Sequence, residues 1–132
     1  MTNTENVLTN EFGDLFVLNL NVNFVNNKTE IIFGKNLDSL PIKKMLFNDV
    51  IWQEFSEFDF ENIFNSIEIF KNFESFYNAK QPYFNKMKNY ISSEKMLEIR
   101  SPNLFYYSFL QTSGMNCFVI TKAEVQILYV QT

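Results

Sequence analysis

Few side chains in this sequence could carry out covalent chemistry. The 132 residues include no histidine and a single cysteine, Cys117. Serine and cysteine nucleophiles usually need an imidazole as general base, and zinc sites usually contain histidine or several cysteines. Cys117 follows a turn in an apolar segment, where a thiol is normally an inert packing group. We therefore expect no nucleophilic catalysis, no zinc site and no redox role for Cys117.

The sequence also gives little support for phosphate binding or for carboxylate catalysis. The three glycines are isolated from one another, whereas a phosphate-binding loop needs several glycines close together. Glu57, Asp59 and Glu61 could supply an acid and a base or bind a hard cation, but their spacing is not that of an EF-hand. The sequence therefore predicts a protein that is not an enzyme and that uses no cofactor and no metal.

The charge is unevenly distributed along the chain. Fifteen acidic and eleven basic residues give a net charge of -4. The segment 49–74 contains seven acids and one base, a net charge of -6, and the rest of the chain has a net charge of +2. A protein that grips a nucleic-acid backbone needs a basic surface, and the densest charge here is acidic. We expect no direct binding of nucleic acid, and a protein partner with a basic surface.

The N-terminal part predicts a β-hairpin. Between residues 15 and 25 apolar residues alternate with asparagines. The apolar set is Leu18, Leu20, Val22 and Phe24, and the asparagines are Asn19, Asn21 and Asn23. This period of two indicates a strand with one solvent face, and residues 26–28 favour a turn before an extended pattern over residues 29–34. We expect the apolar row to face the helices and the asparagines to face solvent.

The middle of the chain predicts helices. Leu40–Pro41 favours the start of a short helix, since proline fits a first turn. Residues 57–77 carry apolar residues at helical intervals behind a capping box at residues 56–59. Gln81–Pro82 opens a further helix, and residues 92–100 fit either a helical turn or a strand.

The C-terminal part favours strands again. Residues 104–112 are rich in aromatic side chains, residues 113–116 suit a turn, residues 117–121 are apolar and residues 124–130 alternate. Two strands, then helices, then three strands with tight connections predict an α+β fold, a mainly antiparallel sheet with central helices packed on one face. No linker or repeat divides the chain, so we expect residues 1–132 to form a single domain.

Acidic side chains fall on one stripe of the helix predicted around residues 57–77. A helical wheel aligns Glu54, Glu57, Glu61 and Glu68, and Asp59 lies in the same first turn. No lysine or arginine interleaves with them, so like charges four residues apart repel one another. The stripe is either a solvated helix face or a docking surface for a basic partner. We take all five acids as candidate partner-binding residues.

The C-terminal segment resembles a known protein family. An aromatic strand at residues 105–110, a polar turn at residues 113–116, an apolar strand at residues 117–120 and the alternation of residues 125–127 resemble the closing hairpins of immunity proteins of bacterial polymorphic and contact-dependent toxin systems. The resemblance implies a cytosolic antidote that binds a cognate toxin, commonly a nuclease, and blocks its active site. An acidic surface suits that role because nuclease sites are electropositive.

Two alternatives stay open. A phage-encoded inhibitor of bacterial nucleases would use the same electrostatics. A small-ligand-binding domain would instead use an aromatic pocket around Trp52, Tyr83 and Tyr90, between the helices and the sheet. The first ten residues are polar and no apolar run has the length of a membrane span, so we expect a cytoplasmic protein with no membrane contact.

Overall fold

The computed structural model describes residues 4–5, 15–56, 63–113 and 116–130. The strands of these residues are β1 (Thr4–Glu5), β2 (Phe16–Asn23), β3 (Lys28–Gly34), β4 (Lys43–Phe47), β5 (Val50–Ser56), β6 (Ile63–Phe70), β7 (Phe105–Ser113), β8 (Asn116–Thr121) and β9 (Gln126–Tyr129). The helices are α2 (Phe73–Ala79), α3 (Gln81–Met87) and α4 (Ser93–Ile99). The predicted α+β fold with a mainly antiparallel sheet is therefore confirmed.

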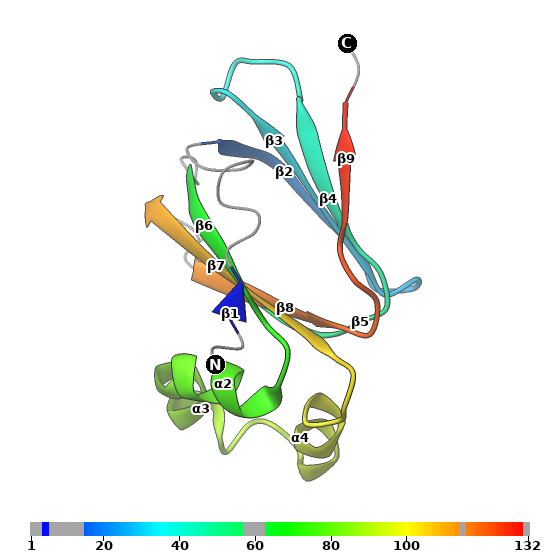
Figure 1. Ribbon diagram of the computed structural model, residues 1–132, viewed down its shortest axis with the longest axis vertical. Helices are drawn as coiled ribbons and strands as arrows, with labels where there is room; N and C mark the ends of the chain where they lie inside the picture. The colour runs from blue at the N-terminus through cyan, green and yellow to red at the C-terminus, as the bar shows by residue number, and fades with distance from the viewer. Residues whose placement is uncertain (1–3, 6–14, 57–62, 114–115, 131–132) are drawn as a thin grey trace.

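The strands form one bent sheet with the order β5-β8-β7-β6-β2-β3-β4-β9, and β1 lies beside β6. All pairings among the described strands are antiparallel. β2 and β6 pair at a single register position, Phe16 with Ile63, so the sheet divides there into two halves. Figure 1 shows the half-sheet β2-β3-β4-β9 at an angle to the half-sheet β6-β7-β8-β5, with the helices gathered beyond the second half.

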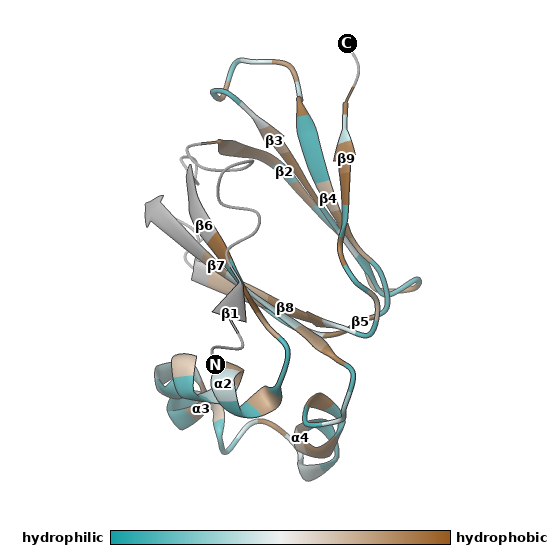
Figure 2. Cartoon of the chain, viewed as in Figure 1, coloured by the Kyte–Doolittle hydropathy of each residue, from teal (hydrophilic) through white to brown (hydrophobic). Residues whose placement is uncertain are grey.

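The second half-sheet is packed on both of its faces. One buried cluster lies between the two half-sheets, and its members include Ile31, Phe33, Met45, Phe47, Tyr107 and Val119. Another lies between the second half-sheet and the helices, and its members include Phe76, Phe84, Ile99, Tyr106, Phe118 and Ile120. Neighbours along a strand belong to different clusters because side chains alternate across a sheet. The fold is thus three layers deep, and Figure 2 shows hydrophobic and hydrophilic residues side by side on α2 and α4, as expected for helices with one buried face.

The helix predicted over residues 57–77 is wrong. Residues 63–70 form β6, and α2 begins only at Phe73, while residues 57–62 lie outside the described part of the chain. Ile67 and Ile69 of β6 face one cluster and Phe70 faces the other. A strand that is buried on both faces loses its alternation, and its apolar residues then also fit a helical period.

The short helix predicted from Leu40–Pro41 is also wrong, because residues 43–47 form β4 between β3 and β9. Met45 and Phe47 are fully buried, whereas Leu46 between them and Lys44 before them are only half-buried. The backbone of β4 pairs with a strand on each side, which satisfies its hydrogen-bonding groups as well as a helix would. Tertiary pairing therefore decides the structure of this segment.

The predicted N-terminal hairpin is confirmed as β2 and β3, and the three asparagines of β2 are exposed as expected. The apolar row was expected to face the helices, and for Leu20 this is wrong. Leu20 lies opposite Ile31 and packs between the half-sheets. A register irregularity between Val17 and Asn19 brings Val17 into the same cluster. Phe24 lies beyond the end of β2 and is 83% exposed, so its predicted inward position is wrong.

The other predicted elements are confirmed. α3 begins at Gln81 with Pro82 in its first turn, and the three C-terminal strands are β7, β8 and β9. The segment 92–100, which fitted two patterns, contains α4 with its two caps. Its N-cap Ser92 accepts a hydrogen bond from the Lys95 N–H at 3.1 Å, which satisfies a free donor at the helix start.

Two hydrogen bonds join the start of β5 to the β2–β3 hairpin, although these strands belong to different half-sheets. The Val50 N–H donates to the Asn27 carbonyl at 2.9 Å, and the Thr29 hydroxyl donates to Gln53 Oε1 at 2.6 Å. Asn27 and Asp49 flank this contact with φ values of 53° and 52°, a left-handed backbone that Asn and Asp tolerate better than most residues. The start of β5 is therefore fixed against the β2–β3 turn.

Phe76 of α2 should contribute strongly to stability. It is fully buried, and its ring contacts four other rings, those of Phe70, Phe84, Tyr106 and Phe118. We expect Phe76→Ala to lower the free energy of unfolding by about 3–5 kcal/mol, because it leaves a cavity between the helices and the sheet. The exposed Phe24→Ala control should change it by less than about 0.5 kcal/mol. Urea unfolding measures both values, and equal losses would contradict this packing.

Candidate functional site

The structure locates two of the five predicted partner-binding residues. Glu54 lies on β5 and Glu68 on β6, and both side chains are half-buried. Glu57, Asp59 and Glu61 lie outside the described residues. Because Glu54 and Glu68 belong to two separate strands, the predicted helical stripe that aligned them is wrong. A role for the five acids in partner binding stays a prediction.

Glu54 and Glu68 nevertheless share one row across the second half-sheet. The register pairs Glu54 with Phe118, Phe118 with Ser108, and Ser108 with Glu68. Neighbouring strands are about 4.8 Å apart, so the backbones at the two glutamates are about 14 Å apart. Phe118 packs beneath the helices, so this row faces the helix layer. There, burial lowers the pKa of Lys80, and the Glu68 carboxylate partly opposes this by raising it.

Trp52 connects β5 to α3. Its indole N–H donates to the Tyr83 hydroxyl at 3.1 Å, and burial is the main cause that raises the pKa of Tyr83. The Lys95 ammonium lies 5.5 Å from the centre of a Trp52 ring and donates to the Ile51 carbonyl at 3.0 Å. Trp52 and Tyr83 therefore meet between helix and sheet, as the aromatic-pocket alternative predicts. Tyr90 is 79% exposed and does not take part.

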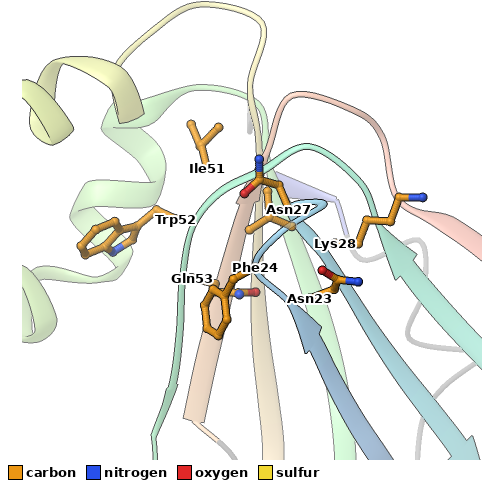
Figure 3. Close-up of a pocket in the computed structure, with 8 residues that line it drawn as sticks. Asn23, Phe24, Asn27, Lys28, Ile51, Trp52 and Gln53 are labelled. Atoms are coloured by element: carbon orange, nitrogen blue, oxygen red, sulfur yellow. The ribbon is translucent and has the colours of Figure 1, made fainter.

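A groove lies between the β2–β3 turn and the start of β5 (Figure 3). Its volume is about 250 Å³. One wall consists of Asn23, Phe24, Asn27 and Lys28, and the other consists of Val50, Ile51, Trp52 and Gln53. The backbone bond from Val50 to Asn27 holds the two walls at a fixed distance. The groove is therefore formed before any ligand binds.

The turn beside this groove presents two apolar side chains to solvent. Phe24 is 83% exposed and Val25 is 91% exposed. The Asn26 N–H donates to Asn23 Oδ1 at 3.1 Å, and the left-handed backbone of Asn27 completes the turn. Apolar groups that project beside a hollow are typical of protein-docking surfaces, because a partner gains free energy by covering them.

The charges near the groove have both signs. A second hollow, of about 250 Å³, adjoins the first and shares Asn27, Val50 and Ile51 with it. Its charged lining consists of Asp49, Lys95, Glu98 and Lys122. Lys95 also forms an ion pair with Glu98. The described surface around the groove is thus an apolar patch with a mixed-charge rim.

Cys117 is 1% exposed and forms no disulfide. Burial raises the pKa of its thiol well above the ordinary value, so the thiol is protonated at neutral pH. A protonated, buried thiol is a poor nucleophile. These properties agree with the packing role that the sequence predicts.

A metal centre or a known relative would point to a further site. In the described parts of the chain, no three His, Cys, Asp or Glu side chains gather as a metal-binding group. No helix of those same residues is long and apolar enough to cross a membrane. Comparison with known protein families, curated proteins and solved structures gave no significant match. The resemblance to immunity proteins therefore stays a prediction from the sequence.

The exposure of Phe24 and Val25 does not follow from the sequence pattern. The alternation of residues 18–24 places Phe24 in the buried row, but β2 ends one residue earlier, at Asn23. A signal was present, since Phe24 and Val25 stand directly before the turn residues 26–28. Residues next to a predicted turn normally lie at the surface, so two large apolar residues beside it are a signal of exposed apolar groups.

Replacement of Cys117 by alanine should affect stability and leave function unchanged. The side chain packs between the two half-sheets, so Cys117→Ala should lower the free energy of unfolding by about 1–2 kcal/mol. Cys117→Ser tests the same position with a group that retains most of the volume. Urea unfolding and titration with a binding partner measure the two effects. A folded Cys117→Ala protein that no longer binds would contradict the packing role.

Proposed function

We propose that this protein is a small binding protein that inhibits a protein partner. The observation that carries this proposal is the pair of exposed apolar side chains, Phe24 and Val25, beside a preformed groove. In its most specific form, the proposal is an immunity protein that blocks a toxin of the nuclease type. Two features support this form: the resemblance of the C-terminal hairpin to immunity proteins, and the acidic segment at residues 49–74.

Phe24 and Val25 suit a docking role because a partner can cover them without opening the core. Complete burial of an apolar side chain of this size contributes about 1.5–3 kcal/mol. The hydrogen bond of Asn26 to Asn23 orders the turn in advance, which reduces the entropy lost on binding. The adjacent groove accepts one apolar side chain of the partner in return.

The acidic segment supports a partner with a basic surface. Its net charge of -6 over residues 49–74 attracts positive charge before contact and speeds encounter. Glu54 and Glu68 are half-buried and act mainly through this long-range field. Glu57, Asp59 and Glu61 are candidates for direct contact with basic groups on the basis of the sequence alone. A nuclease site, which binds phosphates, has the required polarity.

A double variant tests the apolar surface. The full chain is used to capture its partner from the source cells, and the purified partner is then titrated by calorimetry. Phe24→Ser with Val25→Ser should weaken binding at least about tenfold, or about 1.4 kcal/mol, because the partner no longer buries these groups. Tyr90→Ser with Leu97→Ser is the control. These two side chains are also exposed, but they belong to the helical region and do not line the groove. Equal affinity of the two double variants would contradict the docking surface.

Charge reversal tests the acidic segment. Raising the salt concentration from dilute to physiological shortens the Debye length from about 30 to about 8 Å, so the association rate with a basic partner should fall more than the dissociation rate changes. Glu57→Lys with Glu61→Lys should slow association further. Glu94→Lys with Glu124→Lys makes the same change in net charge at two exposed positions outside the segment. Stopped-flow kinetics measure these rates, and equal slowing by both reversals would show that only the net charge matters.

A further inference from the structure

A separate pocket lies on the helix side of the second half-sheet. Its volume is about 240 Å³, and its lining comes from β5, β8 and the junction of α2 with α3. The lining residues are Glu54, Ala79, Lys80, Pro82, Tyr83, Cys117 and Phe118. This pocket shares none of its lining with the groove at Phe24, so an inference about it goes beyond the docking function.

Lys80 is the unusual group of this pocket. Its side chain is half-buried, and its ammonium makes no hydrogen bond or ion pair with another described residue. Burial lowers the pKa of Lys80, while Glu68 and Cys117 raise it to a smaller extent. Cys117 is a protonated thiol at neutral pH, so the Glu68 carboxylate is the charge that acts. The remaining groups that face the pocket, Glu54 and Tyr83, lie on β5 and α3.

Tyr83 supplies a proton donor in the same pocket. The Tyr83 oxygen accepts the hydrogen bond from the Trp52 indole, so its own hydroxyl proton is not used in that bond. The Trp52 contact fixes the position of the hydroxyl between α3 and β5. A carbonyl compound in this pocket would therefore meet an amine and a hydroxyl donor together, the pair of groups that imine formation needs.

We propose that Lys80 is a nucleophilic amine and that its pocket takes a small, uncharged aldehyde or ketone as an imine. The Lys80 nitrogen attacks the carbonyl carbon, and the electron pair of the C=O bond moves to oxygen, which takes a proton from Tyr83 or water. One amine proton returns to Tyr83 or water and restores that donor. Loss of one water molecule, which carries away the oxygen, the proton that it received and the second amine proton, leaves the C=N bond. Tyr83 and Phe118 provide apolar walls, and the nearby Glu54 and Glu68 carboxylates disfavour an anionic carbonyl compound.

Reductive alkylation of the full chain tests this proposal. Propionaldehyde and cyanoborohydride convert each imine to a stable propyl-lysine, and peptide mass spectrometry measures the rate at every lysine. At about pH 7.5, Lys80 should react more than about twofold faster than Lys86 and Lys88, because a lysine of lowered pKa holds more free amine there. Lys86 and Lys88 are exposed and lie on or beside the same helix, so they are matched controls. At about pH 11 the advantage should disappear, because every lysine is then largely neutral.

Three further comparisons make the result specific. Glyoxylate, an aldehyde of similar size with a negative charge, should lose the preference for Lys80. Tyr83→Phe should slow the reaction of Lys80 and leave Lys86 unchanged, whereas a merely structural effect would appear as a lower melting temperature without this selectivity. Lys80→Arg should remove the fast site entirely. If reaction rates at both pH values simply follow exposure, with Lys80 slower than Lys86, the proposal is overturned.

The test is independent of partner binding. The variant Phe24→Ser with Val25→Ser should retain fast alkylation of Lys80, since the two sites share no lining residues. Loss of fast alkylation in that variant would contradict a self-contained pocket at Lys80. Failure of the docking function and failure of the reactive lysine are therefore seen in different measurements.

Discussion

The packing of β6, β7 and β8 on both faces constrains the rest of the structure. These strands separate one apolar cluster, shared with the other half-sheet, from another, shared with the helices. Adjacent residues along them enter different interiors, as Tyr106 and Tyr107 do. The Tyr106 hydroxyl donates to the carbonyl of Ile99, the last residue of α4, while the Tyr107 hydroxyl accepts from the Val125 N–H on the opposite side. Each tyrosine thus adds one polar contact to the layer that it enters.

The same double burial decides which parts of the fold the sequence reveals. β2 has a solvent face, so its alternation with asparagine identifies it, and β7 and β8 are recognised by their aromatic and β-branched residues around a turn. β6 also carries β-branched and aromatic residues, but Ile67, Ile69 and Phe70 fill both interiors, and their spacing matches a helix equally well. The sequence does not reveal β4 for a different reason. Its two neighbours in the sheet, β3 and β9, lie far apart from each other in the sequence, so no local pattern marks the pairing. Only pairing across the sheet distinguishes these segments from helices.

The site residues also divide into those that the sequence indicates and those that only the fold brings together. The concentration of acid in residues 49–74 is readable from composition, but the positions of Glu54 and Glu68 depend on the register of four strands. The exposure of Phe24 depends on where β2 ends, which an alternating pattern does not mark. Lys80 gives no sequence signal, because its surroundings come from α3, β5, β6 and β8. Composition therefore predicts the charge of the chain, and chain topology determines which side chains meet.

The pairing of β5 with β8 has a consequence for how the chain acquires its structure. β5 ends at Ser56 and β8 begins at Asn116, so a chain made from its N-terminus completes α2, α3 and α4 before β5 has its neighbour. Contacts of such sequence separation form late, because closing a long loop costs entropy before any pairing offsets it. Until then the hydrogen-bonding groups of β5 that β8 will pair stay open to other strands. Strand β8, which is synthesised well after β5, is thus the strand that protects this edge of β5.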